Sequence, residues 1–332
     1  MTYTKTGGDP PLIEKYGDLF HESRNCRKEA VEECGLPLID LQYLSSSDEA
    51  ERQACISDMA TASSEWGFFQ VVNHGISDEL VERMRKEQRK VFEMAFEKKR
   101  SSSSLNDSYR WGGAPNAPSV NHMSWSEAFH VPLSKISDHR DDPPFNSLRL
   151  VMKEFAKAMA ELALSLSGIL ARKLGQSPEY FPENCDERTC FLRLNRYPPC
   201  PFSPDVCGLV PHTDSDFLTI LCQDQVGGLQ LMKDSKWVSV KPNSKALIVN
   251  IGDLFQAWSN GAYKSVEHRV MTNPTVERHS IAYFLCPSYE APISTSLQPP
   301  LYKKFTFREF RQQVQEDVKK MGYKIGLPRF LL

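Results

Sequence analysis

The sequence lacks an excess of charge of either sign, because 40 Lys and Arg residues are balanced by 42 Asp and Glu residues. The net charge of -2 argues against a nucleic-acid partner, and no lysine-rich run marks a membrane surface. No apolar run is long enough to span a bilayer, and the first residues show no apolar segment typical of a secretory signal. We therefore expect neither a nucleic-acid nor a membrane partner.

The nine cysteines also lack a framework, because their number is odd and no Cys-x-x-Cys pair occurs. This pattern argues against the regular disulfide set of a small secreted domain. We expect free thiols and a reducing compartment, the cytoplasm and also the nucleus.

What the sequence does contain is enough apolar material for a large core, since 40% of its 332 residues are hydrophobic. Residues 1–35 are polar without clear periodicity, and we expect a loose N-terminal arm there. Residues 36–145 should form a region of helices and strands. Residues 146–332 should form one catalytic unit of a long helix, a β core and a last helix.

Four helices are indicated by apolar residues that recur every three or four positions. They are expected over residues 48–65, 78–99, 146–174 and 307–321. Ser77 is a plausible N-cap of the second helix, and Thr306 with Glu309 makes a capping box for the last one. The serine-rich stretch 101–108 reads as a flexible connector.

After residue 188 the pattern changes to short alternating or apolar runs separated by turn signals, which predict strands. The runs are 189–197, 217–222, 229–232, 237–240, 246–251, 263–270 and 280–286. Two further strands are expected at 36–41 and within 67–75. This succession indicates an antiparallel sandwich or barrel, so the predicted fold class is α+β, a β core with helices packed on it.

The segment GLVPHTDSDF at 208–217 places His212 and Asp214 two residues apart. In an extended chain, side chains at positions i and i+2 point the same way, so an imidazole and a carboxylate would converge on one point. A metal ion could lie there. A polar loop in which Asp214 accepts a hydrogen bond from its own backbone is the alternative, and this segment alone does not decide between them.

A third ligand is offered by the alternating run YKSVEHRV at 263–270, where His268 shares a buried face with two valines. Taken alone, His268 is a hydrogen-bonded core residue. Together with the first pair, two imidazoles and one carboxylate make the ligand set of non-haem Fe(II) centres, which leaves three positions open on an octahedral ion. Zinc could use the same ligands, but a structural zinc site would need a fourth, and the nearby cysteines have no partner at ligand spacing.

The strand ERHSIAYF at 277–284 puts Arg278, Ser280, Ala282 and Phe284 on one face. A guanidinium with a hydroxyl two residues away can clamp a carboxylate. A surface salt bridge is the alternative for the arginine, although the apolar residues on the same face favour an inward site.

The predicted strand RLNRYPPCP at 193–201 also places an arginine and further polar side chains on one face. Arg193, Asn195 and Tyr197 alternate onto that face before the prolines. A polar strand that faces solvent is the alternative here. Arg196 should point away from that face.

The chain resembles the plant 2-oxoglutarate- and Fe(II)-dependent oxygenases. The motifs that carry the resemblance are WGFFQVVNHG, NRYPPC, PHTDSDFLTIL, GGLQL, NIGD, SVEHRV and the Arg-x-Ser of RHS. Within that family the chain is most similar to the gibberellin 2-oxidases that act on twenty-carbon gibberellins, through SYRWG, SWSEAFH and DLFQAWSNG. The resemblance runs from residue 36 to the C-terminus and leaves out the first 35 residues.

The resemblance implies a double-stranded β-helix, or jelly roll, flanked by helices. It implies that His212, Asp214 and His268 bind iron. It further implies that Arg278 and Ser280 hold the distal carboxylate of 2-oxoglutarate, helped by Tyr197, with Asn195 close by.

The implied reaction is 2β-hydroxylation of a gibberellin, which inactivates the hormone, coupled to oxidative decarboxylation of 2-oxoglutarate. Fe(II), 2-oxoglutarate and dioxygen are the implied cofactor and co-substrates, with ascorbate in support. The alternatives are another plant oxygenase, such as a gibberellin 20- or 3-oxidase or a flavonoid oxidase, and a jelly-roll hormone-binding protein without turnover.

Gibberellins carry at least one carboxylate on a rigid apolar ring system, so their site should offer apolar walls and one cation. We predict Arg193 as that cation, with Arg110 on the SYRWG loop as its rival. An ion pair of Arg193 with Asp216 is the alternative. Phe284 is the candidate wall, although it could equally be a plain core residue.

Overall fold

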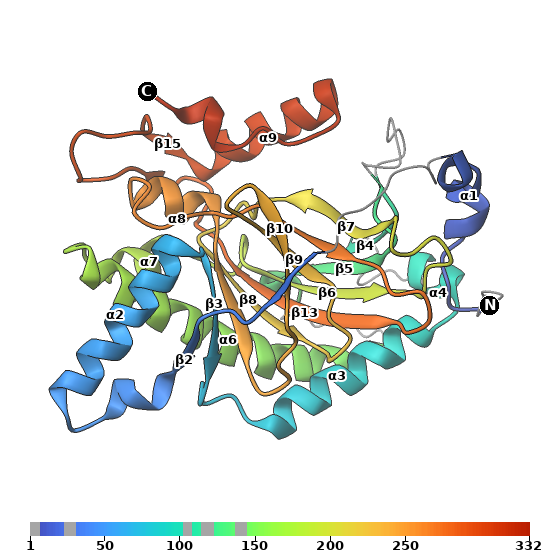
Figure 1. The fold of residues 1–332 in the computed structure, drawn as a ribbon, viewed down its shortest axis with the longest axis horizontal. Coiled ribbons are helices and arrows are strands. Elements are labelled where there is room, and N and C mark those ends of the chain that lie inside the picture. Colours follow the sequence, from blue (N-terminus) through green and yellow to red (C-terminus); the bar gives the residue numbers. More distant parts are fainter. Residues whose placement is uncertain (1–6, 23–30, 102–107, 114–122, 137–144) are drawn as a thin grey trace.

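The computed structural model describes residues 7–22, 31–101, 108–113, 123–136 and 145–332. Two β-sheets face each other and form a jelly-roll core, with helices around them (Figure 1). Leu36, Phe68, Leu231 and Val270 are among the buried apolar side chains packed between the strands of the two sheets. Within this described part of the chain, no helix is long and apolar enough to cross a bilayer.

The smaller sheet has five strands, and its order places the metal-ligand candidates near one edge. It consists of β1 (Glu33–Cys34), β10 (Lys236–Val240), β9 (Leu229–Lys233), β12 (His268–Met271) and β7 (Cys207–His212), in this order. Strand β7 carries Pro211 and occupies the edge, where a missing backbone N–H is tolerated. The sequence pattern missed β7, because Gly208 and Pro211 interrupt its alternation.

The larger sheet has eight strands. Arg278 and Ser280, here called the arginine clamp, lie near its middle. The sheet consists of β2 (Leu38–Asp40), β3 (Phe68–Val72), β11 (Leu247–Ile251), β8 (Leu218–Gln223), β13 (Arg278–Leu285), β6 (Phe191–Tyr197), β5 (Glu127–Pro132) and β4 (Tyr109–Trp111), in this order. A short hairpin of β14 (Pro292–Ile293) and β15 (Phe305–Thr306) lies apart from both sheets. The predicted strands at 36–41, in 67–75 and after residue 188 are confirmed, except that 263–270 contracts to β12.

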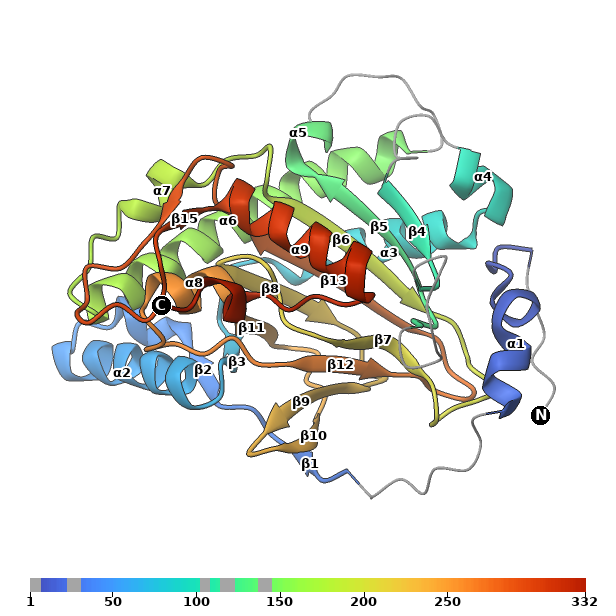
Figure 2. The same cartoon turned by 90° about the horizontal axis from the view of Figure 1, so that it is seen from above.

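Helices surround the two sheets (Figure 1). The helices are α1 (Leu12–Glu22), α2 (Glu49–Glu65), α3 (Asp78–Glu93), α4 (Phe96–Ser101), α5 (Leu133–Ile136), α6 (Asn146–Lys173), α7 (Tyr180–Asn184), α8 (Asp253–Trp258) and α9 (Phe307–Met321). The long α6 packs against β8, β13 and α3 (Figures 1 and 2). The sequence predictions for α2, α6 and α9 are confirmed, and α9 begins with the expected capping box of Thr306 and Glu309.

The helix predicted over 78–99 is confirmed as far as Glu93, but its continuity is wrong, because the chain breaks there and a separate helix begins at Phe96. The break lets Lys99 turn inward, where its fully buried ammonium donates to the carbonyls of Gly8 and Phe92 and pairs with Glu127. The predicted connector at 101–108 lies mostly outside the described residues. Tertiary contacts with the N-terminal segment therefore override the helical pattern.

The prediction of a loose arm over residues 1–35 is wrong for the part that the structure describes. Helix α1 buries Leu12 and Tyr16 against a cluster that includes Trp125 and Phe202. Just before α1, the carboxylate of Asp9 lies 2.8 Å from the guanidinium of Arg196. The few apolar residues of this short helix show no clear period in the sequence, although they suffice to anchor the segment.

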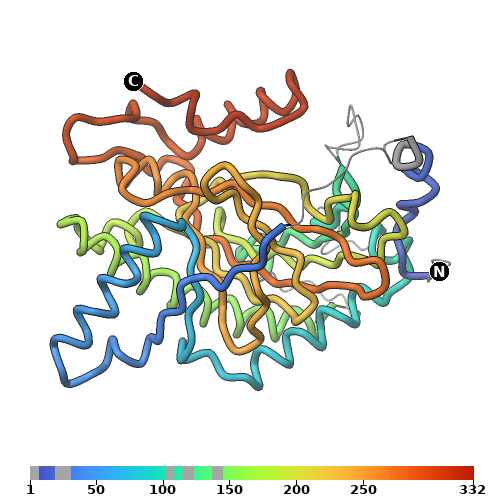
Figure 3. Tube along the Cα trace, viewed as in Figure 1, coloured from blue at the N-terminus to red at the C-terminus, as the bar shows by residue number. Residues whose placement is uncertain are grey.

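The chain after α9 lies along the same side of the β core as α8 (Figure 3). Gly322 ends α9 in the left-handed conformation, with a φ of 85°, and reverses the chain. Leu327 and Phe330 are buried, and Phe330 packs against the rings of Phe305 and Phe310. The C-terminal segment is thus part of the folded unit.

Candidate active site

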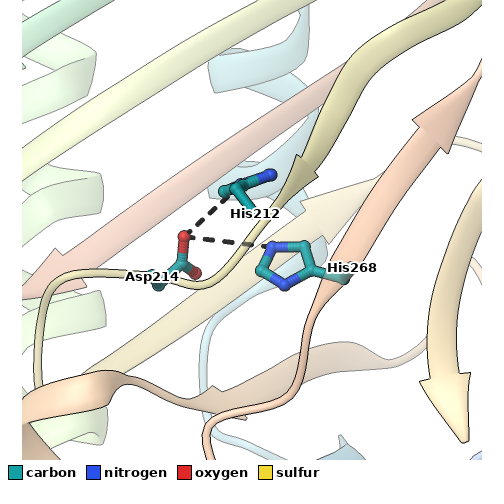
Figure 4. Close-up of side chains that lie close together, drawn as sticks. All are labelled: His212, Asp214 and His268. Carbon is teal, nitrogen blue, oxygen red and sulfur yellow. Dashed lines mark ion pairs between the residues drawn. The ribbon is translucent and has the colours of Figure 1, made fainter. Parts of the chain in front are cut away.

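The metal-ligand candidates meet because of strand register. His212 ends β7, His268 begins β12, and the two residues are direct partners in the antiparallel pairing of these strands. Asp214 follows in the turn after β7, and its Oδ1 lies 3.6 Å from Nε2 of His212 and 3.9 Å from Nε2 of His268 (Figure 4). The three ligand atoms lie within 4.8 Å of one another, a spacing that one metal ion could bridge.

Backbone carbonyls orient both imidazoles. Nδ1 of His212 lies 2.8 Å from the carbonyl oxygen of Val210, and Nδ1 of His268 lies 3.1 Å from that of Val266. These contacts favour the tautomer with the proton on Nδ1, which leaves the Nε2 lone pair free for a metal. Both Nε2 atoms are the ones that face Asp214.

The carboxylate of Asp214 is held by two donors on its other oxygen. Its Oδ2 accepts from Oγ1 of Thr219 at 2.7 Å and from Nδ2 of Asn250 at 2.8 Å, so Oδ1 is left toward the histidines. Burial and the neighbouring His268 lower the pKa of His212 to about 3. Burial opposes ionisation of Asp214, but the two histidines and the two donors outweigh it and lower its pKa. His212 and Asp214 are therefore in their metal-binding forms at neutral pH.

A buried arginine without an anionic partner lies beyond the metal-ligand group. Arg278 is only 2% exposed and makes no ion pair among the described residues. Its terminal amino groups reach Gln223 Oε1 at 2.9 Å and Ser280 Oγ at 3.4 Å, its Nε has no partner, and its guanidinium lies 4.9 Å from the centre of the Tyr197 ring. Burying an uncompensated cation is costly, so this site fits a ligand with a carboxylate.

Strand pairing explains how the clamp forms. In the register of β13 with β6, Ser280 lies opposite Asn195, Arg278 opposite Tyr197, and Ala282 opposite Arg193. Nδ2 of Asn195 donates to Ser280 Oγ at 3.3 Å. The two alternating faces predicted from the sequence are thus neighbours on one surface.

One cavity of about 480 Å³ joins the metal-ligand group and the clamp. Every residue predicted for iron or 2-oxoglutarate lines it, and so do Arg193 and Phe284. The aromatic rings of Phe191, Tyr289 and Phe307 also contribute to its wall. The cavity thus offers both charged and aromatic lining.

Arg193 is half-buried in this wall and donates from Nε to Oδ1 of Asn195 at 2.8 Å. The alternative of an ion pair with Asp216 is wrong, because Asp216 instead accepts from Thr219, and no carboxylate of the described residues pairs with Arg193. Phe284 is half-buried and stacks on Phe191 with ring centres 4.2 Å apart, so it forms part of the cavity wall.

The rival cation, Arg110, does not line the cavity. The predicted SYRWG loop is partly a strand, β4, and Arg110 is exposed there and donates to the carbonyl of Tyr109. Arg196 points away from the cavity, as predicted, and pairs with Asp9, Glu127 and Glu277.

The sequence pattern missed several residues of the site. Thr219 and Asn250 orient Asp214, and Gln223 contacts Arg278. Thr219 and Asn250 lie within the motifs PHTDSDFLTIL and NIGD, but nothing in the sequence pattern gave them this role, and Gln223 lies in no motif. Arg311 on α9 lines the cavity and donates to the hydroxyl of Tyr289 at 2.8 Å. No local pattern could have placed a residue of the last helix beside a strand so far away in the chain.

Comparison with known proteins agrees with this geometry. The profile of the 2OG-Fe(II) oxygenase superfamily matches residues 188–287, and that of the non-haem dioxygenase in morphine synthesis N-terminal region matches residues 36–153. Gibberellin 2-beta-dioxygenase 8 of Arabidopsis thaliana is 56% identical over 337 residues, which cover 97% of this chain and 98% of that protein. This match extends into the first 35 residues, so the expectation that they fall outside the resemblance is wrong.

Two further similarities support the same assignment. Gibberellin 2-beta-dioxygenase 6 of Oryza sativa subsp. japonica is 56% identical over 309 residues, with coverage of 91% of this chain and 86% of that protein. The crystal structure of JOX2 in complex with 2OG, Fe and JA superposes with a TM-score of 0.76 at 31% identity, and covers 98% of this chain and 99% of JOX2. The chain therefore belongs to the 2OG-Fe(II) oxygenase superfamily and is a 2-oxoglutarate- and Fe(II)-dependent dioxygenase.

Proposed function

We propose that this protein hydroxylates gibberellins at the 2β position, in a reaction coupled to oxidative decarboxylation of 2-oxoglutarate, and so inactivates the hormone. The observation that carries this proposal is the 56% identity to gibberellin 2-beta-dioxygenases along nearly the whole chain. We further propose that twenty-carbon gibberellins are its substrates, on the motifs SYRWG, SWSEAFH and DLFQAWSNG.

In this proposal His212, Asp214 and His268 hold Fe(II). When bound, the metal supplies the redox chemistry that joins decarboxylation of 2-oxoglutarate and consumption of dioxygen to hydroxylation of the substrate. The carbonyls of Val210 and Val266 keep the two imidazoles in the tautomer that can bind it. Three protein ligands leave three positions of an octahedral ion for the co-substrates.

Arg278 and Ser280 hold the distal carboxylate of 2-oxoglutarate in this proposal. The guanidinium has an unpartnered Nε and no ion pair within the described chain, so a carboxylate would satisfy its charge and its free donor together. Tyr197 and Asn195 keep the two side chains in place, through the ring below the guanidinium and the hydrogen bond to Ser280 Oγ.

The gibberellin would occupy the aromatic part of the cavity. Phe284 and Phe191 present a stacked aromatic wall to its apolar rings. Arg193 is a half-buried cation whose terminal amino groups have no hydrogen-bond partner among the described residues, and we propose that it binds a gibberellin carboxylate.

The test is incubation of the protein with Fe(II), ascorbate, 2-oxoglutarate and a panel of nineteen- and twenty-carbon gibberellins, read by mass spectrometry. We expect products with one added oxygen at carbon 2, and release of labelled carbon dioxide from 2-oxoglutarate in proportion. Oxidation at carbon 20 or carbon 3 would instead indicate a gibberellin 20- or 3-oxidase. A panel without any oxidised product would contradict the proposal.

A further inference from the structure

Lys324 lies beyond α9, yet its ammonium reaches the turn that carries Asp214. Its Nζ donates to the carbonyl of Thr213 at 2.9 Å and to Oγ of Ser215 at 2.7 Å, and lies 2.6 Å from Oδ2 of Asp253. Its side chain is only 16% exposed. The C-terminal segment thus contacts the residues on both sides of Asp214.

The turn itself, residues 213–217, has no regular secondary structure and is held from outside. Backbone N–H groups at the start of α8 donate to its carbonyls: Gly252 to Phe217 at 2.9 Å, Asp253 to Asp214 at 2.9 Å and Leu254 to Asp216 at 3.0 Å. These bonds do not use the carbonyl of Thr213, which lies between His212 and Asp214 in the chain. Lys324 donates to that carbonyl. Lys324 therefore completes the support of the turn at its first residue.

Asp253 connects this support to the segment before His268. Its Oδ1 accepts from Oγ of Ser265 at 2.7 Å, and its Oδ2 accepts from Oγ1 of Thr213 at 3.2 Å besides contacting Lys324. The carboxylate is buried, at 3% exposure of the residue. One buried ion pair thus joins the turn of Asp214, the approach to His268 and the C-terminal segment.

We propose that Lys324 is a positioning residue for the metal site, which sets the place of Asp214 and His212 through the Thr213 carbonyl, Ser215 and Asp253. An ordinary anchor of the C-terminus is the competing explanation. That segment is already anchored by the buried Leu327 and Phe330, so the buried ammonium is not needed to hold it. Two of the three acceptors belong to the turn itself, and the third, Asp253, also accepts from Thr213 of that turn, which points to positioning instead.

The experiment is a Co(II) titration of the metal-free full-length protein, read by the visible absorption of bound Co(II). Lys324→Met keeps most of the side-chain length but removes the charge and all three donors. Loss of an outer partner of a metal site typically costs about 10- to 100-fold in affinity, and we expect about tenfold here because Lys324 acts through the backbone. Lys320→Met is the matched control, since Lys320 is exposed on α9 and its one ion pair among the described residues is with Glu316.

A Co(II) dissociation constant within about twofold of the unsubstituted value in folded Lys324→Met protein would overturn the proposal, even if that variant unfolds at lower urea concentration. If Lys324→Met does not fold, Ser215→Ala replaces it, because it removes one acceptor of the ammonium. We then expect about threefold weaker Co(II) binding, and an unchanged constant would overturn the proposal.

The inference rests on the proposed metal site but not on the gibberellin substrate, since the titration contains none. Asp214→Ala tests the metal site itself in the same assay. If Asp214→Ala binds Co(II) normally, the site assignment fails. If only the Lys324 and Ser215 variants bind normally, the positioning role alone fails.

Discussion

Replacing Arg193 by methionine should weaken gibberellin binding and leave the metal and 2-oxoglutarate sites intact. The guanidinium is half-buried in the cavity wall. Among the described residues its one hydrogen bond runs from Nε to Asn195, and it meets no carboxylate. Its terminal amino groups are therefore available to a substrate carboxylate as a two-point donor. Methionine keeps much of the length and apolar contact while it removes the charge.

The magnitude follows from the kind of bond that is lost. A hydrogen bond to a charged group contributes about 1.5–3 kcal/mol, which corresponds to about 10- to 150-fold in affinity. We expect the KM for the gibberellin to rise by that factor, while the apparent constants for Fe(II) and 2-oxoglutarate stay near those of the unsubstituted protein. The assay is product formation by mass spectrometry over a range of gibberellin concentrations.

Two arginines provide matched controls. Arg188 also lines the cavity, but it is exposed and already pairs with Asp186 at 2.7 Å, so Arg188→Met should have little effect. Arg110 lies outside the cavity, and Arg110→Met should likewise leave the KM unchanged. The decisive comparison uses the methyl ester of the same gibberellin. If Arg193→Met reduces binding of acid and ester equally, the arginine does not recognise the carboxylate.

Three further predictions follow from the site and its surroundings. Asp214→Ala should abolish turnover and Co(II) binding while far-ultraviolet circular dichroism stays unchanged, whereas His279→Gln should bind Co(II) normally because His279 does not line the cavity. Arg278→Lys keeps the charge but loses the planar fork, so the apparent constant for 2-oxoglutarate should rise by about 10- to 150-fold, and an unchanged constant would contradict its role. Burial lowers the pKa of His279 to about 4. The unfolded chain therefore binds the proton first as pH falls from about 6.5 toward 4, so the free energy of unfolding should decrease over that range, and urea unfolding should show a smaller decrease in His279→Gln.

The sequence alone was enough to identify the chemistry of the site. Alternation along a strand repeats every two residues, so Arg278 and Ser280, and likewise Arg193 and Tyr197, had to share a face once each run was extended. His212 and Asp214 are also close together in the sequence, although Asp214 stands in the turn after β7 and not in the strand. The capping box of Thr306 and Glu309 is equally local, and the structure confirms it. The assignment of iron and 2-oxoglutarate to these residues stays a prediction that the substitutions above will test.

Only the tertiary structure decided which local patterns come together. His268 lies beside His212 because β12 and β7 pair in one register, and a shift by one residue would have turned His268 to the other face. Lys324 reaches the turn of Asp214, and Arg311 reaches the cavity, because the chain folds back after β13. Such contacts depend on the path of the whole chain, which carries no signal in a short window of sequence.

The N-terminal segment shows the same limit most plainly. Its polar composition predicted a loose arm, yet Leu12 and Tyr16 are buried and Asp9 pairs with Arg196. A few apolar side chains and one carboxylate are too few to stand out in composition. They are sufficient in the folded protein because Leu12 and Tyr16 join an apolar cluster with Trp125 and Phe202. Just before them, Asp9 pairs with the buried Arg196, and the carbonyl of Gly8 accepts from the buried Lys99.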